Sequence, residues 1–73
     1  MANEETLQFT EIKNGEQNRT YYYADDAKIT VEKVVRVCVR PSGGHRLETS
    51  DGKKFIIAAG WLAIEVGAKE WSF

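Results

Sequence analysis

The stretch Arg46-Leu47-Glu48-Thr49-Ser50-Asp51-Gly52-Lys53-Lys54-Phe55-Ile56-Ile57 decides the fold of this chain. Asp51-Gly52 lies between two strand-like runs, and this dipeptide favours a tight hairpin turn because both residues tolerate positive φ. We therefore predict a β-hairpin here, with its second strand reaching Ala58. Gly60 then predicts a turn or bulge, and residues 61–66 a further strand.

A second β signal lies upstream, between Lys28 and Val39. Its apolar residues recur at a spacing of two, interrupted only at Lys33, and β-branched residues dominate, which favours one strand. A helix over Asp25–Val35 is the alternative, but its Ile, Thr and Val residues have poor helix propensity. The alternation places Cys38 on the face opposite the apolar residues, together with Arg36 and Arg40. Pro41 and the two following glycines are expected to end the strand.

The amino-terminal third gives weaker signals. Leu7 and Phe9 alternate before a turn at residues 13–15, and Arg19–Ala24 is strand-like, so these segments predict a loose first hairpin. The fold class predicted is mostly β: a small antiparallel sheet or partly open barrel of four to five strands, with a flexible acidic N-terminal arm. The expected organisation is an arm (1–18), a β domain (19–66) and an aromatic tail (67–73). The predicted core comprises Ile29, Val31, Val35, Val37, Val39, Leu47, Phe55, Ile57, Leu62, Ile64 and Val66, with Trp61 as a core or rim plug.

Length and composition restrict the function. A chain of 73 residues with a net charge of −1 forms one small domain, too small for a multi-substrate enzyme. The charge is uneven: residues 1–18 hold four Glu against one Lys, whereas residues 28–54 hold seven Lys or Arg against three acidic residues. No apolar stretch is long enough to span a bilayer and the first residues lack a signal peptide's apolar region, so we expect a cytoplasmic protein without membrane contact.

Catalytic and metal chemistry find little support. Cys38 and His45 are the only residues of their types, which leaves no metal-ligand spacing, no disulfide and, at best, an unoriented Cys–His pair. We expect Cys38 to be a semi-buried strand residue and His45 to face solvent. Glu4-Glu5 and Asp25-Asp26 are adjacent pairs that do not converge as an acid and base would. The sequence predicts a non-enzymatic protein without cofactor or metal.

Binding is better supported. An alternating strand buries one face only, so Tyr21, Tyr22 and Tyr23 cannot all enter one core, and at least one ring should be available to a partner. Trp71 and Phe73 either fold back over the core, which we favour, or serve a partner. Nucleic acid is the alternative partner, because basic residues and tyrosines along a β surface suit single strands, although the net charge of −1 opposes it. The residues assigned to this alternative are Arg36, Arg40, Arg46, Lys53 and Lys54.

In size and make-up the chain resembles the host-takeover proteins of bacteriophages, among them the RNA-polymerase-binding transcription regulator of a Xanthomonas-infecting phage. The features nearest to that family are Glu4-Glu5, the tyrosine triplet and the hairpin of residues 46–57. The resemblance implies binding to bacterial RNA polymerase near the amino end of the β′ subunit, in the host cytoplasm. We expect a monomer, although an unpaired edge strand could also pair with its own copy. It further implies inhibition of promoter transcription and antitermination, that is, read-through of terminators. Under this hypothesis the partner-binding residues are Glu4, Glu5, Leu7, Phe9, Tyr21, Tyr22 and Tyr23.

Overall fold

The structure is a computed structural model that describes residues 7–71. These residues form seven strands and one short 3-10 helix, and the helix that the sequence offered as an alternative over residues 25–35 does not form. The elements are β1 (Thr10–Glu11), β2 (Asn18–Tyr22), η1 (Ala24–Asp26), β3 (Lys28–Glu32), β4 (Val34–Val39), β5 (His45–Thr49), β6 (Lys54–Ile57) and β7 (Ala63–Gly67).

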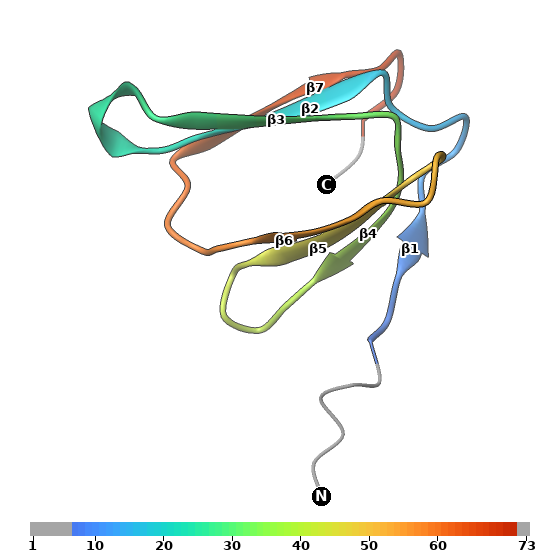
Figure 1. Ribbon diagram of the computed structural model, residues 1–73, viewed down its shortest axis with the longest axis horizontal. Helices are drawn as coiled ribbons and strands as arrows, with labels where there is room; N and C mark the ends of the chain where they lie inside the picture. The colour runs from blue at the N-terminus through green and yellow to red at the C-terminus, as the bar shows by residue number, and fades with distance from the viewer. Residues whose placement is uncertain (1–6, 72–73) are drawn as a thin grey trace, which may run out of the picture.

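The strands make two antiparallel sheets that lie one above the other (Figure 1). The four-stranded sheet has the order β1-β4-β5-β6, and the three-stranded sheet has the order β3-β2-β7. The prediction of a mostly β, antiparallel fold is confirmed. Residues 7–71 contain seven strands rather than four or five, and the two sheets do not close into a barrel.

The β5–β6 hairpin forms where Asp51-Gly52 predicted it. Leu47 is opposite Phe55 and Glu48 is opposite Lys54. Gly52 has φ 86°, the positive value that the turn requires. The Asp51 carboxylate accepts a hydrogen bond from the Thr49 hydroxyl, and this bond lowers the pKa of Asp51. Contacts within the same segment from which the hairpin was predicted therefore determine the turn.

The run from Lys28 to Val39 is not one strand, which corrects the prediction. Lys33 has φ 62° and divides the run into β3 in the three-stranded sheet and β4 in the four-stranded sheet. Its backbone N–H donates to the Gln17 carbonyl (3.0 Å), and its carbonyl accepts from the Ser50 N–H (2.9 Å). The register of β4 against β5 also shifts between Val34 and Arg36, which leaves Val35 in a bulge. The single charged interruption in the apolar pattern marks the crossing between sheets.

The predicted first hairpin is also wrong. β1 pairs with β4, whereas β2 lies between β3 and β7 (Figure 1). The boundary of the predicted arm, residues 1–18, changes as a result: residues 1–6 lie outside the described part of the chain, but Thr10–Glu11 pair within a sheet and Glu16 is buried. The second half of the predicted arm therefore belongs to the two-sheet body.

The core lies between the sheets. Its buried apolar side chains are Tyr21, Val31, Val34, Val37, Leu47 and Ile57, with Ile12, Tyr23, Phe55, Trp61 and Ile64 packed against them. Three residues assigned to the core are exposed instead: Ile29 on edge strand β3, Val39 at the end of β4, and Leu62 before β7. Strand ends and edges have too few neighbours to cover a side chain, whatever its place in the alternation. Cys38, expected to be semi-buried, is fully buried.

Candidate functional site

Five polar and aromatic side chains join the two sheets through the core. Glu16, Arg19, Tyr21 and His45 are all buried, although three of them are ionisable or charged at neutral pH in water. Arg19 donates from Nε to Glu16 Oε1 (3.0 Å) and from Nη2 to Oε2 (2.8 Å), which is a bidentate pair. Arg19 Nη1 donates to the Tyr21 hydroxyl oxygen (3.2 Å).

The chain of bonds continues into the other sheet. The Tyr21 hydroxyl lies 2.6 Å from Nδ1 of His45, on β5. Nδ1 accepts the Tyr21 hydroxyl hydrogen in the neutral tautomer with hydrogen on Nε2, and donates to the phenolic oxygen in the other tautomer. Trp61 packs against both rings, with centroids 6.0 Å from Tyr21 and 5.4 Å from His45, and its Nε1–H donates to the Gly43 carbonyl (3.2 Å). We call Glu16, Arg19, Tyr21, His45 and Trp61 the buried network.

The electrostatics of the buried network keep each group in one charge state. Burial disfavours the charged guanidinium, but hydrogen bonds to Glu16 and Tyr21 outweigh it and raise the pKa of Arg19. Burial raises the pKa of Tyr21, although Arg19 opposes that shift. Burial, together with the charge of Arg19, lowers the pKa of His45. At neutral pH the Glu16–Arg19 ion pair therefore lies beside a neutral tyrosine and a neutral histidine.

The prediction that His45 faces solvent is wrong. The alternation of β5 places His45 and Leu47 on the same, inward face, which is the sequence signal that would have found it. The same spacing of two puts Arg19 and Tyr21 together on the inward face of β2. Among residues 7–71 no group of three or more His, Cys, Asp or Glu side chains is arranged to hold a metal ion.

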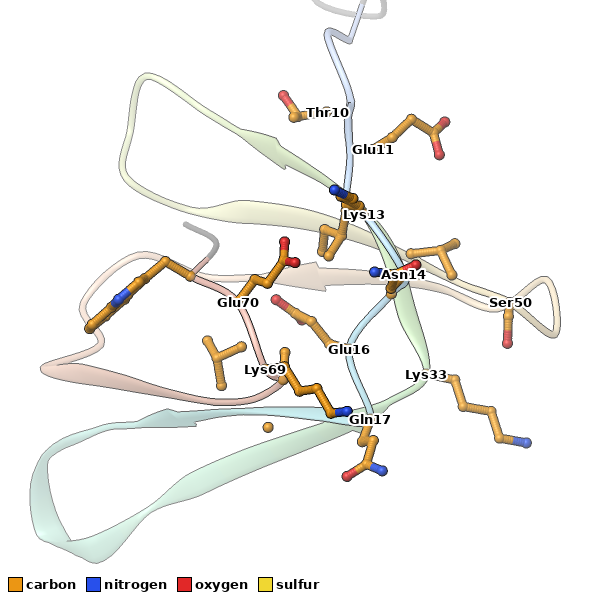
Figure 2. A pocket seen from close by; sticks show the side chains of 17 residues that line it. Thr10, Glu11, Lys13, Asn14, Glu16, Gln17, Lys33, Ser50, Lys69 and Glu70 are labelled. Atoms are coloured by element: carbon orange, nitrogen blue, oxygen red, sulfur yellow. The ribbon is translucent and has the colours of Figure 1, made fainter.

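An open groove of about 1300 Å³ lies at one end of the two sheets. One side is built by residues 10–17, which include β1 and the β1–β2 connection, and the other by residues 66–71 at and after the end of β7. Figure 2 shows Glu16 and Glu70 on these two sides. Ile12, Val35 and Val66 supply apolar lining, and Trp71, which also lines the groove, is 100% exposed. The predicted folding back of Trp71 over the core is thus wrong, and Phe73 lies outside the described residues.

The structure separates the residues predicted to bind a partner. Glu4 and Glu5 lie outside the described residues, and Leu7 and Phe9 are half-buried just before β1. Tyr21 is buried in the core, which removes it from any contact surface. Tyr22 and Tyr23 are half-buried, and their hydroxyls donate to Glu65 Oε1 (2.5 Å) and to the Ala58 carbonyl (2.8 Å). The triplet is therefore mainly a packing and bridging element.

The predicted nucleic-acid residues are partly brought together. Arg36 is opposite Glu48, Arg46 is opposite Ile56, and Lys54 is opposite Glu48, so the three basic residues share the outer face of the four-stranded sheet. Arg36 is ion-paired there with Glu11 and Glu48, and Lys54 lies 3.9 Å from Glu48. Arg40 follows the end of β4, and Lys53 is exposed in the β5–β6 turn. Carboxylates thus interrupt the basic surface.

Comparison of the chain with protein-family models, curated proteins and solved structures gives no match. The described residues contain no helix long and apolar enough to cross a bilayer. The functional proposal that follows therefore depends on the site geometry and on the resemblance in size and make-up noted above.

Proposed function

We propose that this chain is a non-enzymatic regulator that acts in the cytoplasm of a bacterial host by binding another protein, and that bacterial RNA polymerase is the partner. The buried network supports a non-catalytic role, because its ionisable groups bond one another and hold the two sheets together. The resemblance to phage host-takeover proteins supports the polymerase, with the amino end of its β′ subunit as the binding region. Regulation would consist of blocked promoter use and antitermination.

The observation that carries the proposal is the fully exposed Trp71 beside an open groove with apolar lining. Tryptophan is among the side chains that contribute most to protein–protein binding, because one ring covers a wide area at low entropy cost. The segment with Leu7 and Phe9 leads directly into β1, whose residues line the same groove. The groove is thus where the arm and the tail can contact one partner together.

The charges of the groove favour a protein over a phosphate backbone. Its lining holds the exposed cations Lys13, Lys33 and Lys69 together with the exposed carboxylates Glu11 and Glu70, whereas Glu16, also in the lining, is buried in its pair with Arg19. A nucleic-acid site needs an excess of positive charge, because most of its affinity comes from phosphate contacts. A lining that presents charges of both signs instead fits a protein surface that does the same, where complementarity selects the partner.

The test is binding of purified, nuclease-treated RNA polymerase core enzyme to the wild type and to two variants. Trp71→Ala is expected to weaken binding about tenfold or more. Leu62→Ala is the matched control: Leu62 is also large, apolar and 73% exposed, but it lies before β7 rather than after it, and its removal should change little. Failure of the core enzyme to bind the wild type would overturn the proposal.

Charge and transcription assays extend this test. Replacing Glu4 and Glu5 by Lys should slow association, and more so at low salt, because steering by exposed charges is screened by ions. Tyr22→Ala should mainly speed dissociation if the tyrosines contact the partner, as the sequence predicted. In transcription with purified components, the wild type should reduce promoter initiation and increase terminator read-through, and Trp71→Ala should lose both effects together.

Single-stranded nucleic acid is the second candidate partner, and the common face of Arg36, Arg46 and Lys54 favours it. Because Arg36 already bonds two carboxylates, a phosphate must displace Glu11 or Glu48 to reach it. Under this reading, neutralising Arg36 and Arg40 together abolishes a strongly salt-dependent binding to single-stranded RNA or DNA. Unchanged binding in that double variant would exclude a nucleic-acid contact through Arg36 and Arg40.

A further inference from the structure

The edge of the four-stranded sheet at β6 differs from a protected sheet edge. β6 is the last strand in the order β1-β4-β5-β6, and Figure 1 shows it at the open margin of its sheet. The sequence from Phe55 to Ile64 contains no charged residue. Within it Ile56 is 74% exposed on the outer face of β6. A long exposed aliphatic side chain on an edge strand is an arrangement that proteins normally avoid.

The backbone of β6 offers a defined set of hydrogen-bonding groups at this edge. The Thr49 N–H donates to the Lys53 carbonyl (3.0 Å), and the register then places Phe55 opposite Leu47 and Ile57 opposite His45. In an antiparallel pair every second residue points its N–H and C=O at the neighbour, and the residues between point away. Lys54 and Ile56 therefore direct both backbone groups away from β5. The next position along the edge, Ala58, has its carbonyl already bonded by the Tyr23 hydroxyl.

The edge of the other sheet at β3 provides the contrast. Tyr23 N–H donates to the Ala27 carbonyl (2.8 Å), so the same alternation directs the backbone groups of Lys28, Thr30 and Glu32 away from β2. Their side chains are polar or charged, which is how natural sheets protect an edge from pairing. Of the two β6 residues whose backbone groups point away from β5, Lys54 is charged, but Ile56 is apolar and exposed. The two edges have the same backbone alternation. Ile29 of β3 is also exposed, at 41%, but Ile56 of β6 is more exposed and β6 has one charged residue where β3 has two, so β6 is the edge more open to another strand.

We propose that the β6 edge binds an extended segment of the partner protein by strand addition, as a fifth strand of the four-stranded sheet. The N–H and C=O groups of Lys54 and Ile56 supply the backbone bonds, as in other strand-addition complexes. An apolar side chain of the segment covers Ile56, and an acidic one faces the exposed Lys53 and Lys54. This inference rests on the proposed function, because it adds to the groove a second contact with the same partner protein, at the edge of the sheet opposite β1.

Charge disfavours a second copy of this chain as the occupant. Two β6 edges pairing with each other would bring Lys53 and Lys54 of both chains into one short interface. Unlike charges across an interface favour association and like charges oppose it, so an acidic segment suits this edge better than a basic one. Self-association is accordingly one of the outcomes that the experiment must distinguish.

The experiment uses a matched pair of proline substitutions, Lys54→Pro in β6 and Lys28→Pro in β3. Each replaces an exposed lysine at the first strand residue, each removes one outward N–H, and proline is tolerated at the start of an edge strand. Binding of purified RNA polymerase core enzyme should weaken about tenfold or more in Lys54→Pro and stay within about twofold of wild type in Lys28→Pro. Ile56→Ala, which leaves the backbone intact, should also weaken binding and carries the test if Lys54→Pro lowers the melting temperature.

Amide hydrogen exchange gives a second measurement, and its result would not change on binding if Lys54 and Ile56 had only a structural role. The Lys54 and Ile56 amides should exchange fast in the free protein and slowly in the complex. Equal binding by Lys54→Pro, Ile56→Ala and wild type overturns the strand-addition inference and leaves the proposed function standing. Absence of binding by wild type overturns both. A wild-type dimer in sedimentation that Lys54→Pro dissociates also overturns the inference, because the occupant is then a second copy.

Discussion

Two arginines bond carboxylates in this fold, and their surroundings are opposite. The Arg19 side chain is fully buried and forms a bidentate pair with Glu16, whereas the Arg36 side chain is 43% exposed and pairs with Glu11 and Glu48 on an outer face. A charge removed from water is tolerated only if it is paired and fully hydrogen-bonded. A charge at the surface keeps its water whether or not it has a partner. The first pair is therefore a condition of folding and the second is an adjustable surface feature.

The largest effect is expected from Arg19→Met. It leaves the Glu16 carboxylate buried beside an apolar side chain and should lower the free energy of unfolding by about 3 to 5 kcal/mol. A domain of this size has a total stability of only about 5 kcal/mol, so the variant should retain at most about 2 kcal/mol of it. Urea unfolding followed by tryptophan fluorescence measures the change.

A double variant separates charge from shape. Glu16→Gln combined with Arg19→Met leaves no buried charge in the pair, so it should be more stable than Arg19→Met alone. If the double variant is no more stable than the single one, packing around the guanidinium, and not the unpaired carboxylate, causes the loss.

Tyr21→Phe should have the next largest effect. It keeps the ring in the core but removes the hydroxyl that bonds Arg19 and His45. Leaving buried donors and acceptors unsatisfied should lower the free energy of unfolding by about 1 to 3 kcal/mol. Tyr22→Phe is the control, since its hydroxyl bonds Glu65 in an exposed position and its loss should be barely measurable. Equal losses in the two variants would contradict the distinction between buried and exposed bonds.

The fold that places the two arginines in such different surroundings could be predicted from the sequence only in part. Local signals sufficed for the β5–β6 hairpin, because Asp51, Gly52 and Thr49 determine that turn by contacts within a few residues. They did not suffice for Lys33, whose positive φ is maintained by hydrogen bonds to Gln17 and Ser50, residues distant in the sequence. The crossing between sheets at Lys33 is what separates β3 from β4. The interruption of the apolar pattern marks its position, but it does not indicate that the chain changes sheet there.

The candidate site was likewise predictable only in part: local signals indicate some of its residues but not their contacts. Alternation alone places Arg19 with Tyr21, and His45 with Leu47, on inward faces, so these three members of the buried network were accessible to sequence reasoning, whereas Glu16, in the β1–β2 connection, was not. Their meeting was not, because Tyr21 and His45 belong to different sheets and are 24 residues apart. The groove also joins residues 10–17 to residues 66–71, a juxtaposition that depends on the strand order and not on any motif.

His45 should make stability depend on pH. Its pKa is lowered by burial and by Arg19, so the unfolded chain binds a proton more readily than the folded one. Stability is therefore complete above the unfolded pKa of about 6.5 and is lost as the pH falls below it. The slope for one proton is at most about 1.4 kcal/mol per pH unit.

Chemical denaturation between pH 7.5 and pH 5 tests this expectation. His45→Asn cannot take up a proton in that window, and its amide oxygen can accept from Tyr21 in place of Nδ1. The wild type should lose stability over the window while His45→Asn stays level. If the stability of wild type and of His45→Asn falls equally with pH, a group other than His45 is responsible.

The smallest effect is expected from Arg36→Ala, the surface counterpart of Arg19→Met. Hydrogen bonds to Glu11 and Glu48 raise the pKa of Arg36, so the residue stays charged at every pH used here. Its removal leaves the two carboxylates in contact with water, which solvates them without a partner. Stability should change less than in Tyr21→Phe, and added salt should shrink the difference from wild type, because ions screen exposed charges. A large loss of stability, undiminished in salt, would show that β1 depends on Arg36 for its attachment to β4, and the division between a buried pair that the fold requires and a surface pair that it does not would then fail.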